Sequence, residues 1–220
     1  MTKAARTAHA LTLSVTLALS GCAATPASTG PVRPQASTST TARTVKKYDE
    51  DAFWRVVEDA RRRTDGDPDA MAEVLADEFA DAGDDSLRSF QRQLVAASRR
   101  LYTWRHGTAA DMVCGSLGDD GFTDWRSWVI TLGRRTFEQI AADPDNLADV
   151  EDIEAGCAGE GELFGAAVSG IFQARHGNAD DSFPVLEPGD TSPAGAPPSG
   201  YPMHGTDPLR ATLPRVAKRT

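Results

Sequence analysis

Three carboxylates lie close together in the middle of the chain. Asp119 and Asp120 are followed, after a glycine, by Asp124 and Arg126. Clustered carboxylates attract cations or the cationic groups of a partner. The spacing lacks the alternating oxygen ligands and closing Glu of a calcium-binding loop, so no metal is predicted here. We take the four residues as a candidate binding site. The alternative is structural, with one aspartate capping a helix that begins near Phe122.

A cysteine near the N-terminus stands in a sequence that marks it for lipid attachment. Leu19-Ser20-Gly21-Cys22 is an apolar residue, two small residues and a cysteine, the order of the bacterial lipobox. A thiol is needed because a diacylglyceryl group is transferred to the sulfur before the preceding segment is cleaved. That segment has a basic start, Lys3 and Arg6, and an apolar run shorter than the ~20 residues that span a bilayer. The alternative is a chance apolar start in a cytoplasmic protein, which the order of these features makes the less favoured interpretation.

From this order we expect residues 1–21 to be a signal peptide. Cys22 is then the lipidation site and anchors the chain to the extracytoplasmic face of the cell membrane. The acyl chains of such an anchor hold firmly, since each buried CH₂ contributes ~0.8 kcal/mol and a single chain alone is marginal.

The two other cysteines offer one candidate disulfide. Cys114 and Cys157 remain once Cys22 is acylated, and an oxidising compartment favours their pairing. The bond would close a loop of about 44 residues and stabilise the fold by roughly 3–4 kcal/mol. The alternative is a pair of buried free thiols, since Cys114 follows the apolar Met112-Val113. The sequence leaves both open.

Other patterns that could indicate catalysis do not survive inspection. None of the four histidines has a histidine four residues away or a nearby cysteine, so no zinc site is predicted. Gly115-Ser116-Leu117-Gly118 is not a nucleophile elbow, because Cys114 stands where the first glycine is needed. We therefore predict no catalytic residue and no cofactor.

Charge and composition divide the chain into parts. The 220 residues carry a net charge of −9, and residues 46–180 hold 15 basic and 28 acidic residues. Such a surface repels phosphates and excludes general nucleic-acid binding. We expect a signal peptide, a flexible tether, one folded domain and a disordered tail, at residues 1–21, 22–47, 48–177 and 178–220.

The two tails differ from the domain in composition. The tether is mostly Ala, Thr, Ser, Pro and Gly, which bury too little apolar surface to offset the entropy of ordering. Eight of the 13 prolines fall between Pro184 and Pro214, a density that forbids helix and disrupts sheets. We expect disorder there. The alternative is a contact of its basic end with wall polymer or anionic lipid. That end contains Arg210, Arg215, Lys218 and Arg219.

The apolar residues of the domain recur at helical spacing throughout. Asp49 or Asp51 can cap the first helix and Pro68 can start the second. No convincing strand pattern is present. The prediction is an all-α domain of six or seven helices, at about residues 51–63, 68–79, 87–104, 109–114, 122–142 with Gly133 within, 147–153 and 162–175.

Several blocks of the domain resemble a known family. They are Phe53-Trp54-Arg55-Val56-Val57-Glu58, Tyr102-Thr103-Trp104, Leu117-Gly118-Asp119-Asp120-Gly121-Phe122 with the following Trp125-Arg126-Ser127-Trp128-Val129-Ile130 and Gly133-Arg134, and Asp143-Pro144-Asp145-Asn146-Leu147-Ala148. In this order they resemble the bacterial domain-of-unknown-function 4240 family, over about residues 48–177. The chain departs from the family at Arg105-His106-Gly107-Thr108, where an apolar Leu-Trp-Ala-Ala stretch is usual. The resemblance implies a compact helical domain and no particular activity.

The layout favours recognition over catalysis. A tethered module gains effective concentration at a membrane surface, and its acidic surface favours a basic protein partner. The expected contact region is the exposed part of the 119–124 segment with Arg126. An envelope hydrolase with a site assembled from distant residues is the main alternative, and a structural envelope lipoprotein is another.

Overall fold

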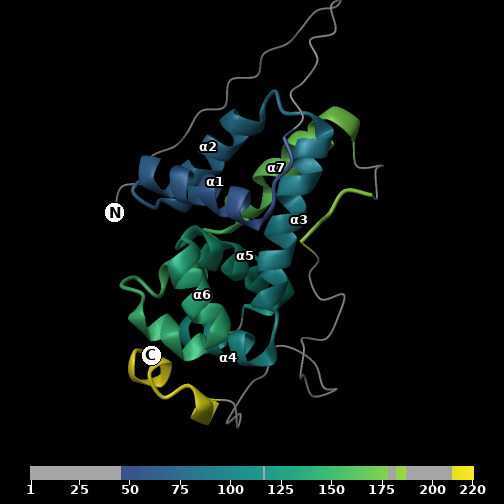
Figure 1. The fold of residues 1–220 in the computed structure, drawn as a ribbon. Coiled ribbons are helices and arrows are strands. Elements are labelled where there is room, and N and C mark those ends of the chain that lie inside the picture. The colour runs from purple at the N-terminus through teal and green to yellow at the C-terminus, as the bar shows by residue number, and fades with distance from the viewer. Residues whose placement is uncertain (1–45, 116, 178–181, 187–209) are drawn as a thin grey trace, which may run out of the picture. The chain divides into compact units, whose positions relative to one another are not determined.

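The computed structural model describes residues 46–115, 117–177, 182–186 and 210–220 (Figure 1). The expected signal peptide, the lipidation site Cys22 and nearly all of the expected tether lie outside the described residues. The same is true of residues 187–209 in the expected tail. The described residues all belong to one unit.

The described residues form an all-α domain, which confirms the predicted fold class. They contain seven α-helices, four short 3₁₀ helices and no strand. The α-helices are α1 (Glu50–Arg63), α2 (Pro68–Phe79), α3 (Asp84–Arg100), α4 (Trp104–Cys114), α5 (Gly118–Thr131), α6 (Arg134–Ala142) and α7 (Glu162–His176). The 3₁₀ helices are η1 (Pro144–Asp149), η2 (Ala155–Ala158), η3 (Arg210–Thr212) and η4 (Val216–Lys218). None of these helices is both long and apolar enough to cross a membrane.

Local signals explain where several helices begin. The Asp49 carboxylate accepts a hydrogen bond from the Ala52 N–H at 2.7 Å and caps α1. Asp67 caps α2 in the same way, and Pro68 occupies the first helical turn. Acidic residues in the first turn and arginines in the last turn of α1 both suit the helix dipole.

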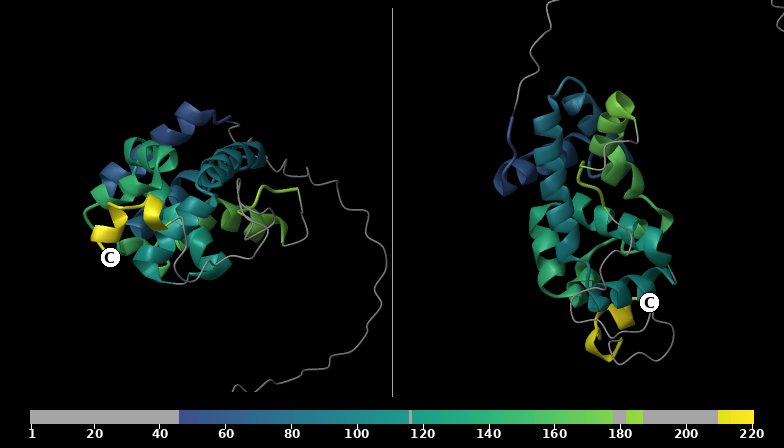
Figure 2. Two further views of the ribbon diagram at one scale, coloured as in Figure 1. Left: turned by 90° about the horizontal axis from the view of Figure 1, so that it is seen from below. Right: turned by 90° about the vertical axis from the view of Figure 1, so that its right-hand side faces the viewer.

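Helix α5 lies at the centre of the domain and packs against each of the six other α-helices (Figures 1 and 2). Its inner face is fully buried and aromatic, which explains the tryptophan spacing in the sequence. Trp125, Trp128, Phe122, Val129 and Ile130 are all at most 2% exposed. Burial of side chains this large is the main stabilising term of such a core.

Several helix boundaries differ from the sequence prediction. The third helix ends at Arg100, and Trp104 starts α4, because the Thr103 hydroxyl caps a new helix by accepting the His106 N–H. The stretch from 122 to 142 is two helices, since Gly133 takes a positive φ of 89° between them. The expected helix at 147–153 is replaced by η1 and turns.

The expected disorder of the C-terminal tail needs correction at two places. Residues 182–186 lie on the domain, with Phe183 stacked on Phe172 at 4.2 Å between ring centroids. Residues 210–220 also lie on it, against α4 and η1 (Figures 1 and 2). Leu213 and Val216 are fully buried there. Disorder was expected because of the proline content. The burial of two apolar side chains and several arginine contacts offset the entropic cost of ordering this segment.

Candidate functional site

The acidic cluster lies in the first two turns of α5. The helix begins at Gly118 without a side-chain cap, and Asp119 and Asp120 occupy its first turn. The alternative prediction, that one aspartate caps a helix beginning near Phe122, is therefore wrong. Both carboxylates nevertheless suit the positive end of the helix dipole. Both are exposed, whereas Asp124 is half-buried one turn further on.

Arg126 does not join these carboxylates at the surface. Its side chain is 3% exposed, and its Nη2 donates to the Thr123 hydroxyl at 2.9 Å. The guanidinium lies over the ring of Tyr102, 4.6 Å from the centroid. The prediction that Arg126 forms part of an exposed contact region is wrong, because its apolar stem and planar head pack against aromatic rings instead.

Asp124 lines a small hollow of about 250 Å³ between α3, α5, α7 and residues 185–186. Burial raises the pKa of the Asp124 carboxyl, and Glu162 and Asp120 raise it further by repulsion. The Gln91 amide oxygen is buried nearby and has no hydrogen-bond partner among the described residues. The hollow can accept a small hydrogen-bond donor. Arg126, which the sequence placed in the same site, does not line it.

A second and larger groove, of about 1040 Å³, runs along α1 and α6. It gathers acids, arginines and Trp54, the combination that would favour an enzyme. Three of the acids, Asp51, Asp59 and Glu138, form ion pairs, however. Arg100 lowers the pKa of Glu138 through a hydrogen bond. A general acid needs a raised pKa, so Glu138 is poorly suited to donate a proton at neutral pH.

The turn between α5 and α6 lies beside this groove. The Glu58 carboxylate of α1 accepts the Arg134 N–H at 2.8 Å and so caps α6. A Cβ on Gly133 would come within 2.9 Å of the Glu58 Oε1 atom, and the φ of 89° favours glycine as well. Gly133-Arg134 therefore has a structural role that joins two helices.

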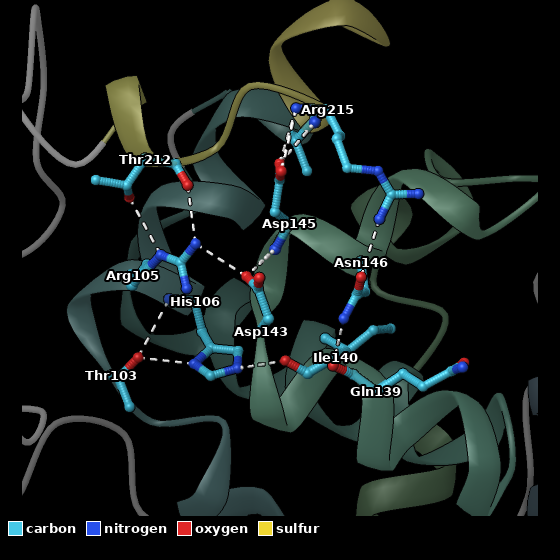
Figure 3. Close-up of polar contacts among 11 residues, drawn as sticks. Thr103, Arg105, His106, Gln139, Ile140, Asp143, Asp145, Asn146, Thr212 and Arg215 are labelled. Atoms are coloured by element: carbon cyan, nitrogen blue, oxygen red, sulfur yellow. Dashed lines mark hydrogen bonds and ion pairs between the residues drawn. The ribbon is translucent and has the colours of Figure 1, made fainter.

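His106 is a buried histidine with two fixed partners. Its Nε2 donates to the Ile140 carbonyl at 3.0 Å, and its Nδ1 accepts from the Thr103 hydroxyl at 2.7 Å (Figure 3). A carbonyl can only accept, so the neutral ring carries its proton on Nε2. Burial lowers the pKa of His106 to about 4, and Arg105 lowers it further. The ring ties α4 to the end of α6 and is not a ligand.

Cys114 and Cys157 form a disulfide, with their Cα atoms 5.1 Å apart. The bond joins the last residue of α4 to η2 across 43 positions of sequence. It holds the segment between α6 and α7 against α4. Among the described residues, no group of three or more His, Cys, Asp or Glu could hold a metal ion.

A buried carboxylate of η1 binds the C-terminal segment. The Asp145 carboxylate accepts the backbone N–H groups of Arg215 at 2.9 Å and Val216 at 3.0 Å (Figure 3). Asp145 itself is 6% exposed. It therefore acts as the cap of η4 from a distant part of the chain.

Arginines complete this contact from both sides. Arg215 donates to Asn146 at 2.9 Å and forms an ion pair with Asp149. Arg219 donates to the carbonyls of Ala148 and Glu151, at 2.9 and 3.0 Å.

The domain also contributes a basic side chain to this contact, because Arg105 binds the segment. Its Nη2 donates to the Thr212 carbonyl at 2.8 Å and pairs with Asp143 at 2.9 Å (Figure 3). We call the surface formed by Arg105, Asp143, Asp145, Asn146 and Asp149 the α4–η1 face.

The α4–η1 face was missed by sequence reasoning. The sequence singled out its two halves separately, Asp143-Pro144-Asp145 within a block that resembles the family and the basic end as part of the tail. About 70 positions separate them, as between Arg215 and Asp145. The opposite charges of the two segments were the available signal, but many other acids of the domain offered the same charge.

Comparison with known proteins gives a family and no characterised relative. No curated protein and no solved structure is significantly similar to the chain. A family model described as a protein of unknown function (DUF4240) matches residues 48–173. That range covers α1 to α6 and most of α7, and leaves the C-terminal segment outside. The chain therefore belongs to the DUF4240 family.

Proposed function

We propose that the chain is a membrane-anchored extracytoplasmic lipoprotein whose domain binds a basic protein partner without catalysis. The proposed location is supported by the lipobox at Leu19-Ser20-Gly21-Cys22. The recognition rests on one observation: the α4–η1 face receives a basic segment through the Asp145 carboxylate and the ion pair between Asp149 and Arg215. A surface that orders one basic segment has the charge and shape to order another.

The exposed aspartates of α5 offer a second contact region for the same partner. Asp119 and Asp120 face solvent in a first helical turn, and Asp124 lies beside them. Replacing all three by Asn would weaken partner capture if they contribute, and leave it unchanged if the α4–η1 face acts alone. The helical circular dichroism spectrum serves as the control for folding.

The anchor is tested with a single substitution. Cys22→Ala removes the thiol that accepts the lipid, so the chain should leave the detergent-extracted membrane fraction. Cys114→Ser with Cys157→Ser is the matched control, because it removes two cysteines and leaves the lipobox intact. Unchanged fractionation of Cys22→Ala would contradict the anchor.

The groove between α1 and α6 favours an envelope hydrolase as the second candidate. It is the larger of the two hollows described above and gathers Trp54 with acids and arginines. Its test is turnover of peptidoglycan fragments or esters by the pure domain, abolished by Glu58→Gln or Asp51→Asn. Asp51 forms an ion pair with Arg134, and Glu58 accepts the backbone N–H of Arg134, so both acids are engaged and recognition is the better supported proposal.

A further inference from the structure

The C-terminal segment is held by the domain much as a bound peptide is held. Its main chain is recognised by Asp145, which accepts two successive N–H groups. Its apolar side chains Leu213 and Val216 are fully buried three positions apart. Its basic side chains Arg215 and Arg219 reach acceptors on and after η1. Backbone capture, apolar anchors and charged flanks together give a sequence-selective site.

The segment and the surface that receives it belong to different parts of the chain. All residues of the α4–η1 face lie within the range matched by the family model, residues 48–173, and the segment lies beyond it. Residues 178–209 connect the segment to α7. The receiving surface is therefore part of the family domain, and its occupant is a separate piece of sequence.

The contacts are of a kind that can be exchanged. The side chains of Arg215 and Asp149 are 45% and 63% exposed, and exposed ion pairs contribute only ~0.2–1 kcal/mol. A covalently attached segment has an effective concentration of about 1 mM, so it occupies its site even with modest intrinsic affinity. A partner segment with the same pattern and further contacts elsewhere can displace it.

We propose that the α4–η1 face is a binding site for basic peptide segments of a partner protein. Residues 212–219 are its built-in competitor, which keeps the site closed until a partner displaces them. The segment recognised has the pattern of Leu213-x-x-Val216-x-x-Arg219 with a basic residue before the valine. This deepens the proposed function, on which it rests, by naming the site and the chemistry of the partner.

The test separates the segment from the domain after folding. A specific protease site is placed within residues 187–209, and the folded full chain is cut and then diluted. We expect the segment to leave while the circular dichroism spectrum and the disulfide are retained. The probe is a fluorescent synthetic peptide of residues 209–220. It should bind the emptied domain at least tenfold more tightly than the uncut chain, in which the site is occupied.

Variants define the contacts. Asp145→Asn in the emptied domain should weaken peptide binding about tenfold, since it removes a charged acceptor of two N–H groups. Arg215→Ala in the peptide should have a similar effect. The matched control is Lys218→Ala, because the exposed Lys218 side chain forms no hydrogen bond or ion pair with the described residues, and its loss should change affinity less than threefold.

Two results would overturn the proposal. In one, the cut domain unfolds or aggregates as the segment leaves, which makes the segment an integral part of the core. In the other, binding is indifferent to Asp145→Asn and to Arg215→Ala. Neither result bears on the lipid anchor, whose failure appears separately as unchanged fractionation of Cys22→Ala.

Discussion

His106 is 3% exposed and joins two parts of the chain. Its ring accepts a hydrogen bond from the Thr103 hydroxyl and donates one to the Ile140 carbonyl. In the neutral ring with the proton on Nε2 both nitrogens have hydrogen-bond partners, and burial disfavours the charged form. The residue is therefore stabilising when neutral and costly when charged.

This histidine should make the fold sensitive to mild acid. Its pKa is about 4 in the folded chain against 6.5 when unfolded, so below pH 6.5 the unfolded chain binds more protons. The contribution is complete above pH 6.5 and is lost as the pH falls to about 4, amounting to about 3 kcal/mol. Urea unfolding between pH 7.5 and 4 measures it.

The His106→Gln variant gives the comparison for that measurement. It should be less stable at pH 7.5 but lose less stability on acidification than the wild type. His176→Gln, at the exposed end of α7, controls for the loss of a histidine. Equal losses of stability in His106→Gln and the wild type would show that His106 does not carry the effect.

The sequence did not reveal the roles of two charged side chains, Arg126 and Asp145. Arg126 looked like a partner for nearby acids, but aromatic rings of α5 and Tyr102 bury it. Asp145 was assigned no role, but it binds a distant backbone. In each case the deciding neighbour is far away in sequence or chemically unexpected, so local patterns could not reveal it.

At the scale of the elements, the junction of α1, α5 and α6 depends on one glycine. Gly133→Ala should destabilise the domain by about 1–3 kcal/mol through its φ of 89°, and further by pushing Glu58 from its capping position. Gly177→Ala is the matched control, because Gly177 has a φ of 72° and nothing within 4 Å. Thermal or urea unfolding measures both.

A double-mutant cycle isolates the contact with Glu58. In a Glu58→Ala background, Gly133→Ala should cost less than in the wild type, because the carboxylate that a new Cβ would meet is gone. Equal costs in the two backgrounds, or equal costs for the two glycines, would assign the whole effect to backbone strain.

The helices themselves could largely be predicted, because apolar periodicity and capping residues are local signals. Asp49 caps α1 and Pro68 starts α2 as expected. The predicted helix boundaries were wrong where a side chain or a proline that starts a new helix had not been taken into account. The Thr103 hydroxyl ended one helix and began the next, and proline and the Asp143 side chain gave a 3₁₀ turn where an α-helix was expected.

At the scale of the whole molecule, the disulfide is the main covalent restraint on the domain. Closing 43 positions between Cys114 and Cys157 should contribute about 3–4 kcal/mol to the free energy of unfolding. Dithiothreitol should lower the stability of the wild type by that amount. The Cys114→Ser, Cys157→Ser variant should start lower and not respond. Identical unfolding of reduced and oxidised wild type would contradict this prediction.

The sequence could indicate a domain between two low-complexity ends, and the described C-terminal segment shows the limit of that inference. Composition averages over a window, whereas docking depends on a few residues in register with a distant surface. Leu213 and Val216 are enough to hold residues that their proline-rich neighbourhood suggested would be disordered.

The position of those anchors has a consequence for the order of events during folding. Residues 213–216 close the site only by docking onto a face built entirely from earlier residues, so the face can form before they cover it. A partner segment that is present at that stage can bind without displacing residues 212–219. A partner that arrives later has to bind tightly enough to displace them.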